Sequence, residues 1–453
     1  MGKYYGLVRL TEPSKHNKYK LILNIYFMES KINLILKEVL EKVNPLQKDL
    51  KEIKERLNEF KMQLKKEIKK FGLDTEIFEG GSFAKNTIIK KDVYDVDVFL
   101  RFNEKYRGKN ISKLTEKLLR KFKFVSLIHG SRDYFRIRIN GNFFIELIPV
   151  IKINFPKKAE NITDLSYSHV RYINKKIKNK SILNDIKIAK AFCYATGTYG
   201  AESHIHGFSG YSLELLVYYY KGFLNFIKAM AKHKKGKLII DIEKHYKNKN
   251  DVLLDINTSK LDSPVILIDP TYKQRNALAA LSEETFEKFR NLCGRFLKNP
   301  SIKDFEVRKF DLENIKADAL KSKYEFILLE AKTSKQEGAV AGSKLLKFYT
   351  HLEFEIRRFF EIKNKGFNYN NKKSAKYFFV VKKKPEIIFE GPFLKDLQNT
   401  DFFKKQHKST FSKSGKIYAK EKVNFNLNDF IQNWKLKYKK KIKEMDIIDL
   451  RIV

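Results

Sequence analysis

Residues 80–101 read GGSFAKNTIIKKDVYDVDVFLR, and this stretch predicts a glycine turn, a short helix and a strand that carries two carboxylates. Successive side chains of a strand point to opposite faces, so Asp95 and Asp97 share one face and the valines beside them point into a core. Two neighbouring aspartates repel each other unless a cation lies between them, and hard oxygen ligands suit Mg²⁺. The strand is therefore a candidate metal site.

The turn ahead of this strand has the composition of a phosphate-binding turn. Gly80 and Gly81, followed by Ser82, can bring backbone N–H groups close to a phosphate, and the helix that they open points its positive end at the same anion. An Asp-x-Asp alone is common on a solvated strand face. Together with a Gly-Ser turn thirteen residues upstream, it favours a metal-dependent nucleotidyl transferase.

A third carboxylate is expected on an adjacent strand. The run NGNFFIELIPVIKIN (140–154) supplies Glu146, an acid inside an apolar segment. Burial of such a group is costly unless it is paired or bound to a metal. The alternative is an edge-strand glutamate that faces water.

Bulk composition indicates a soluble, basic, multidomain protein. The chain has 453 residues, for which we expect about two to four domains. With 93 basic and 53 acidic residues its net charge is +40, and such a field attracts a polyanion. Nucleic acid is the first candidate partner and an anionic membrane surface the second.

The cysteines and the apolar runs predict a cytoplasmic protein. Cys193 and Cys293 each lie in an apolar helical pattern, which predicts buried thiols in a reducing compartment, and their spacing is not that of a zinc site. No apolar run reaches the roughly 18 residues that cross a bilayer. The stretch 19–28 is too short, and lacks the cleavage site, for a secretory signal.

Hydrophobic periodicity and turn residues predict an α+β multidomain fold. Residues 1–27 are expected to be a disordered extension, or the chain starts at Met28, and residues 28–155 form a nucleotidyltransferase catalytic domain whose strands after residue 123 make an antiparallel set. Residues 156–300 form a helical central domain in which PVILIDP (264–270) is a lone strand. A ferredoxin-like RNA-binding region follows at 301–385 and a C-terminal tail region at 386–453.

Longer motifs resemble those of a known family. They are KAFCYATGTYGAESHIHGFSGYSLELLVYYYKGF (190–223), IDPTYKQRNALAALS (268–282) and EGPFLKDLQNTDFFKKQHKSTFSKSGKIYAKEK (390–422), together with GGSFAKNT and DVDVFLRF. In this order they resemble the archaeal-type, class I CCA-adding tRNA nucleotidyltransferases, over about residues 29–440. The resemblance implies a polymerase β-like palm domain, a central domain that binds nucleotide and tRNA, and a homodimer.

This resemblance also implies a reaction. Such enzymes add C, C and A to the 3′ end of tRNA from CTP and ATP without a nucleic-acid template. Two Mg²⁺ ions, held here by Asp95, Asp97 and Glu146, would act on the attacking hydroxyl and on the leaving pyrophosphate. Two departures stand out: the third carboxylate of this family is usually aspartate, and the Ser82-to-Asp95 interval is one residue longer than expected.

Residues that contact the nucleotide are implied in the same way. They are Gly81, Ser82, Lys85, His169, Lys190, Tyr199 and Arg275. Without the resemblance, His169 would be a structural histidine, Lys190 a solvated helix lysine and Tyr199 a core aromatic. Arg275 would be a surface arginine near a helix start. Two other functions stay open: a poly(A) or oligonucleotide polymerase of the same superfamily, and a catalytically silent tRNA-binding protein.

Overall fold

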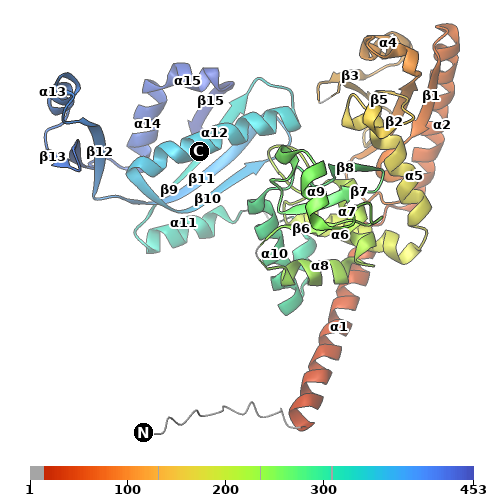
Figure 1. Cartoon of the computed structure of the whole chain (residues 1–453), viewed down its shortest axis with the longest axis horizontal. Helices are drawn as coiled ribbons and strands as arrows, with labels where there is room; N and C mark the ends of the chain where they lie inside the picture. The colour runs from red at the N-terminus through yellow and green to blue at the C-terminus, as the bar shows by residue number, and fades with distance from the viewer. Residues whose placement is uncertain (1–14, 131, 235, 308–309) are drawn as a thin grey trace. The chain divides into compact units, whose positions relative to one another are not determined.

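The structure is a computed structural model that describes residues 15–130, 132–234, 236–307 and 310–453 (Figure 1). The chain divides into two compact units. The first takes in the described residues up to 201 together with 205–307, and the second takes in 202–204 and 310–453. Each is described by itself.

Two helices begin the first unit. They are α1 (Lys15–Val43) and α2 (Gln47–Lys70), with Pro45 between them. The expected disordered extension at 1–27 is therefore wrong from Lys15 onward, where the chain is already helical, and residues 1–14 lie outside the described part. Helix α2 buries the apolar stripe that its spacing predicts, because every third or fourth residue returns to the same face. Its buried members are Ile53, Leu57, Phe60 and Leu64.

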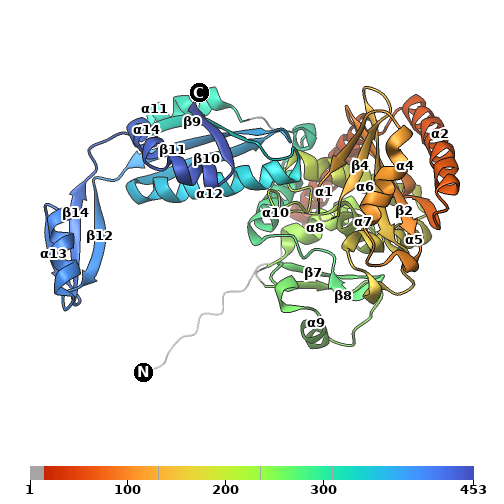
Figure 2. The ribbon, with the colours of Figure 1, turned by 90° about the horizontal axis from the view of Figure 1, so that it is seen from above.

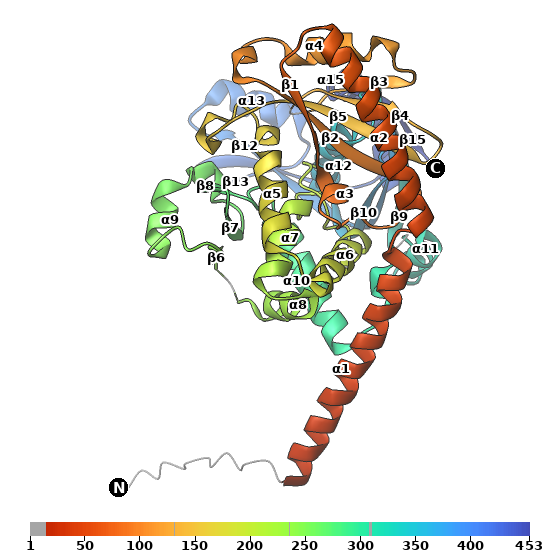
Figure 3. The ribbon, with the colours of Figure 1, turned by 90° about the vertical axis from the view of Figure 1, so that its right-hand side faces the viewer.

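A five-stranded sheet follows (Figure 3). Its elements in chain order are β1 (Thr75–Glu79), α3 (Gly81–Ala84), β2 (Tyr94–Phe102), α4 (Ile111–Leu118), β3 (Val125–Ile128), β4 (Tyr134–Arg138) and β5 (Phe143–Ile151). The strand order is β1-β2-β5-β4-β3. Strands β3, β4 and β5 are antiparallel as expected, but β5 also pairs in parallel with β2. Helices α2 and α4 cover one face of the sheet, where the valines of β2 are fully buried.

Helices dominate the rest of the first unit. They are α5 (Ser166–Lys176), α6 (Lys180–Ala195), α7 (Gly210–Tyr219), α8 (Phe223–Lys232), α9 (Lys249–Asp255) and α10 (Glu283–Lys298). Cys193 and Cys293 are buried in their shared core, as the sequence predicted. The predicted lone strand is β7 (Val265–Asp269), and it has partners: it lies between β6 (Leu238–Ile240) and β8 (Tyr272–Asn276). The sequence missed β6 because it is only three residues long, inside a lysine-rich stretch.

The second unit contains a four-stranded antiparallel sheet. Its elements are α11 (Leu312–Lys321), β9 (Glu325–Thr333), α12 (Ala339–Phe359), β10 (Phe360–Tyr369), β11 (Ser374–Lys383), α14 (Leu427–Lys437), α15 (Lys439–Glu444) and β15 (Ile447–Ile452). The strand order is β10-β11-β9-β15, which is the ferredoxin-like arrangement. Helices α12 and α14 pack on one face and α11 on the other. The sheet extends beyond the expected limit of residue 385, since its last strand is β15.

An insertion separates the third strand of this sheet from α14. It consists of β12 (Glu386–Phe393), α13 (Leu397–Gln406), β13 (Thr410–Lys413) and β14 (Lys416–Lys422). Its strands form a small sheet of order β12-β14-β13, and Figure 2 shows β12, β14 and α13 side by side. Among the helices of the described residues, none combines the length and the apolar character needed to cross a membrane.

Candidate active site

Three carboxylates lie on one face of the first unit's sheet. Strands β2 and β5 run in parallel with Asp97 level with Glu146, and paired residues of neighbouring strands point to the same face. Asp95 lies two residues earlier on β2, hence on that face too. The valines that alternate with the aspartates are fully buried on the opposite face. The strand alternation predicted from the sequence therefore holds, and Glu146 is not an edge residue.

The electrostatics of this face favour a bound cation. Burial raises the pKa of Asp97, the nearby charge of Lys85 lowers it and that of Asp95 raises it again. Burial, and then the neighbouring Asp97 carboxylate, raise the pKa of Glu146 to about 7. Burial and mutual repulsion thus disfavour the ionised forms of Asp97 and Glu146, and a cation bound between them would relieve both effects.

An arginine holds the third carboxylate. Arg136 on β4 is the cross-strand partner of Glu146, and its Nη2 and Nε donate to Oε1 at 2.6 and 3.1 Å. Among the described residues, no three acidic, histidine or cysteine side chains are grouped closely enough to hold a metal ion as they stand. The three carboxylates therefore share one face of the sheet without forming a closed metal site, and Arg136 holds Glu146.

The glycine turn fits tightly against the aspartate strand. The backbone N–H of Gly80 donates to the carbonyl oxygen of Asp97 at 2.9 Å. Gly81 has φ +61°, and a Cβ at this position would overlap the Oδ2 of Asp97. Both observations explain why glycine is needed at position 81: the backbone is left-handed and the carboxylate is adjacent. Helix α3, which the turn opens, has only four residues.

Two predicted nucleotide-binding lysines meet at a buried glutamate that the sequence analysis missed. Lys85 Nζ donates to Glu214 Oε2 at 2.6 Å and Lys190 Nζ to Glu214 Oε1 at 3.0 Å. Thr87 completes the group, because its hydroxyl donates to Glu214 Oε1 at 2.7 Å and accepts from Lys190 at 2.8 Å. All four side chains are buried. The network ties the segment after α3 to α6 and α7.

Burial and charge oppose each other in this network. Burial by itself would raise the pKa of Glu214, but Lys85 and Lys190 hold it at about 2. Burial lowers the pKa of Lys190 to about 8, although Glu214 raises it. One carboxylate thus neutralises only part of the charge of two lysines. The network carries a net positive charge beside Asp97.

A second buried carboxylate joins His169 to Arg275. Asp269, at the end of β7, accepts from Arg275 Nη1 at 2.6 Å and lies 2.9 Å from the His169 Nε2 through the same oxygen, Oδ2. Its other oxygen accepts from the Tyr211 hydroxyl at 3.0 Å and from the backbone N–H of Thr271 at 2.8 Å. Burial would raise the pKa of Asp269, but His169 and Arg275 lower it. Burial lowers the pKa of His169, whose ring stacks on Tyr211.

Tyr199 lies near the Glu214 group, and the charge of Lys85 acts on two of the groups. The ring of Tyr199 stacks on Tyr194 with 4.1 Å between centroids, and burial followed by the charges of Tyr194 and Glu214 raises its pKa. Lys85 lowers the pKa of His169 as well as that of Asp97, so its charge acts on both.

The predicted residues thus form three linked groups: the carboxylates with the glycine turn, the two lysines around Glu214, and His169 with Arg275 around Asp269. The Ser82 carbonyl oxygen accepts from the Thr87 N–H at 2.9 Å, which attaches the turn to the second group. Sequence analysis missed Glu214 and gave Asp269 no role. Each stands as a lone acid in an apolar run, LELL or LID, which is the signal that identified Glu146.

Comparison with known proteins supports the resemblance. Residues 184–306 match the family "tRNA nucleotidyltransferase, second domain". The CCA-adding enzyme of Nanoarchaeum equitans is 40% identical over 241 residues, which are 53% of this chain and 59% of that one. The CCA-adding enzyme of Methanocaldococcus jannaschii is 28% identical over 400 residues, 86% of this chain and 87% of that one. The chain thus matches about three fifths of the first relative and most of the second.

Solved structures give a more distant likeness. The Cid1 poly(U) polymerase with Mg 3′-dATP bound has 13% identity and a TM-score of 0.49, over 62% of this chain and 99% of that one. No functional conclusion follows from an overlay at this level. The matching family domain, the archaeal relatives and the paired carboxylates of β2 and β5 agree with one another. This chain is therefore similar to the archaeal CCA-adding enzymes, and over residues 184–306 it matches the second domain of the tRNA nucleotidyltransferases.

Proposed function

We propose that this chain adds C, C and A to the 3′ end of tRNA, using CTP and ATP without a nucleic-acid template. The observation that carries the proposal is the level pairing of Asp97 with Glu146, with Gly81 directly against Asp97. Relatives named CCA-adding enzymes supply the substrate class.

The three carboxylates fit divalent ions by their donor chemistry. Hard oxygen ligands suit Mg²⁺, and burial together with the neighbouring carboxylates raises the pKa values of Asp97 and Glu146, which a bound cation would offset. Asp95, Asp97 and Glu146 would hold two Mg²⁺ ions, which supply activation of the tRNA 3′-hydroxyl and neutralisation of the leaving pyrophosphate. Glutamate is one methylene longer than the usual aspartate, and in this structure Arg136 contacts the Glu146 carboxylate.

The residues around the carboxylates orient the nucleotide. The backbone N–H of Gly81 and the hydroxyl of Ser82 offer donors to the terminal phosphates, beside the positive charge of Lys85. Glu214 acts as a positioning residue, since it fixes Lys85 and Lys190 in one arrangement.

The histidine–arginine group is the proposed base site. Arg275 donates from Nη1 to Asp269, and its other N–H groups can donate hydrogen bonds to the edge of C or A. Its side chain is 18% exposed, so these donors have limited access to solvent. His169 is held against Asp269 and Tyr211, where it can contact the triphosphate. We further propose that the protein is cytoplasmic and forms a homodimer. Light scattering at the outlet of a gel-filtration column measures the molar mass and so tests the dimer.

The test is an extension assay. Purified protein with Mg²⁺, CTP and ATP should extend tRNA that lacks its 3′ end by three nucleotides and then stop, with products resolved to one nucleotide. Addition of A alone, or of an open-ended tail, would instead identify a polymerase of the same superfamily. Binding without incorporation would identify a silent tRNA-binding protein.

A substitution separates catalysis from binding. Asp97→Ala should abolish incorporation and leave tRNA affinity nearly unchanged, because Asp97 is a proposed metal ligand rather than an RNA contact. Asp262→Ala, at an exposed aspartate outside the site, is the control and should extend tRNA as the wild type does.

A further inference from the structure

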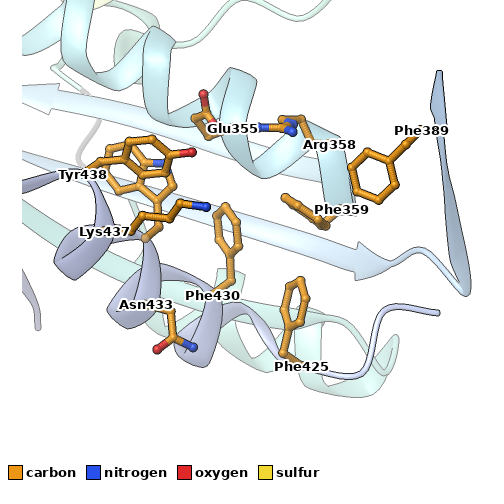
Figure 4. Close-up of a pocket in the computed structure, with 10 residues that line it drawn as sticks. Glu355, Arg358, Phe359, Phe389, Phe425, Phe430, Asn433, Lys437 and Tyr438 are labelled. Atoms are coloured by element: carbon orange, nitrogen blue, oxygen red, sulfur yellow. Dashed lines mark hydrogen bonds and ion pairs between the residues drawn. The ribbon is translucent and has the colours of Figure 1, made fainter. Parts of the chain in front are cut away.

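An aromatic cavity lies in the second unit, and none of the residues assigned above lines it. Its volume is about 320 Å³, within the range of small-ligand sites. Its lining residues are Glu355, Arg358, Phe359, Phe389, Phe425, Phe430, Asn433, Trp434, Lys437 and Tyr438. Figure 4 shows the rings around one space; the side chains come from α12, from β12 of the insertion, from α14 and from the residues that flank α14.

The rings offer flat faces rather than a closed core. Phe359 lies 5.4 Å from Phe425 and 5.2 Å from Phe430 between ring centroids, and the rings of Phe425 and Phe430 are nearly parallel, at 17°. Phe359, Phe389 and Phe425 are only partly buried. Partly exposed aromatic rings grouped around a cavity are costly in water unless a flat apolar partner covers them.

Cations border the same cavity. The Arg358 guanidinium lies 5.6 Å from the Phe359 ring centroid and is 45% exposed. Lys437 Nζ lies 5.7 Å from the Tyr438 centroid, and Figure 4 shows it directed toward Phe430. The acid in the lining, Glu355, is already paired with Arg358 at 3.2 Å. The site thus combines stacking faces with positive charge at its border.

We propose that this cavity binds an unpaired nucleobase of the RNA substrate, with its phosphate beside Arg358 and Lys437. Bases stack on aromatic rings irrespective of sequence, and cations beside the rings follow the backbone. The second unit's sequence from residue 309 on has 33 basic and 18 acidic residues, which favours RNA over a protein partner of ordinary composition. The exposed Asn433 adds an amide that can bond a base edge.

A fluorescent residue of the chain itself can report on binding at the cavity. The cavity proposal rests on the proposed function only because it takes RNA as the ligand. Trp434 is the single tryptophan of the sequence and lines the cavity. Its indole Nε1 is buried without a hydrogen-bond partner among the described residues. A base that enters the cavity should therefore change Trp434 fluorescence.

The experiment uses the full chain in EDTA, so that no nucleotide is incorporated. The probes are an RNA hairpin with an unpaired loop and a blunt duplex of the same stem. The hairpin should quench Trp434 fluorescence and the duplex should not. Phe359→Leu and Phe389→Leu keep apolar volume but remove a stacking face, and each should weaken hairpin binding about tenfold. Lys437→Ala should weaken it and lower the salt slope by about one.

Matched controls lie in the same unit. Phe402→Ala on α13 and Lys439→Ala on α15 change exposed residues outside the cavity and should bind the hairpin as the wild type does. Equal quenching by the duplex, or wild-type affinity of both leucine variants, would overturn the proposal. So would a leucine-dependent loss of self-association, which would make the cavity a contact between copies.

Failure of this inference is distinct from failure of the proposed function. If CCA addition is observed without Trp434 quenching, the cavity proposal alone is wrong. If quenching occurs but tRNA is not extended, the catalytic proposal alone is wrong.

Discussion

Position 81 brings together the metal-binding and phosphate-binding parts of the candidate site. The turn must be left-handed there and must leave room for the Asp97 carboxylate, and glycine satisfies both demands. Gly81→Ala should therefore displace Asp97 and nearly abolish nucleotide incorporation in the extension assay. Gly108→Ala is the matched control, since Gly108 also has positive φ, +74°, but nothing lies within 4 Å of its added Cβ. Equal activity of the two variants would contradict the steric argument.

Glu214 is the residue whose removal should destabilise the first unit most clearly. Glu214→Gln leaves two buried lysines without their carboxylate, at a cost of about 3–5 kcal/mol in the free energy of unfolding. Urea titration measures this cost. Glu38→Gln removes an exposed pair with Lys42 and should change stability little.

The Glu214 contribution has a defined pH dependence. The pKa of this carboxyl falls from 4.5 to about 2 in the folded chain, so its stabilisation is full above about pH 4.5 and is lost as the pH falls toward 2. The stabilities of wild type and Glu214→Gln should converge over that window. A difference that stays constant from pH 5 to pH 3 would contradict the ion-pair assignment.

At the scale of elements, the β7–β8 hairpin acts through Asp269. This carboxylate joins Arg275 on β8 to His169 on α5, so Asp269→Asn should loosen both and raise the KM for CTP and ATP about tenfold. Steady-state kinetics measure this. The matched control is Asp255→Asn: this partly buried carboxylate at the end of α9 pairs with Lys273 of the same hairpin at 3.8 Å, and the KM of the variant should be unchanged. An unchanged KM in Asp269→Asn would remove Arg275 from the proposed base site.

Local pattern predicted some elements and missed others for physical reasons. Strand β2 was predictable because alternation places Asp95 and Asp97 on one face, and α2 because its apolar residues recur at helical spacing. The parallel pairing of β2 with β5 is a long-range contact that no local pattern encodes. The same holds for β15, which joins β9 from more than a hundred residues away across an insertion.

Within the site, the sequence identified residue types better than their partners. Lys85 and Lys190 were singled out by resemblance, but their shared contact with Glu214 depends on how α3, α6 and α7 come together. Asp97 and Glu146 were paired correctly, whereas the Arg136 contact follows from the antiparallel register of β4 with β5. A lone acid inside an apolar run was the one sequence signal that could have found Glu214 and Asp269.

At the scale of the whole molecule, the two units have separate hydrophobic cores, and each unit carries one of the two proposed sites. The core under the five-stranded sheet and the helical core around Cys193 belong to the first unit, while the core between α12 and the ferredoxin-like sheet belongs to the second. The proposed catalytic groups lie in the first unit and the proposed nucleobase cavity lies in the second. Sequence changes in one core can therefore alter RNA binding without touching the carboxylates.

This division should appear in thermal unfolding. Two units with their own cores are expected to give two calorimetric transitions, because each buries its apolar surface largely by itself. Leu352→Ala, at a fully buried position of the second unit's core, should cost about 2–5 kcal/mol and lower one transition only. Leu216→Ala, fully buried in the first unit, should lower the other. If both substitutions instead lowered one common transition equally, the two units would unfold together. A substitution at the cavity could then reduce nucleotide incorporation simply by destabilising the whole protein.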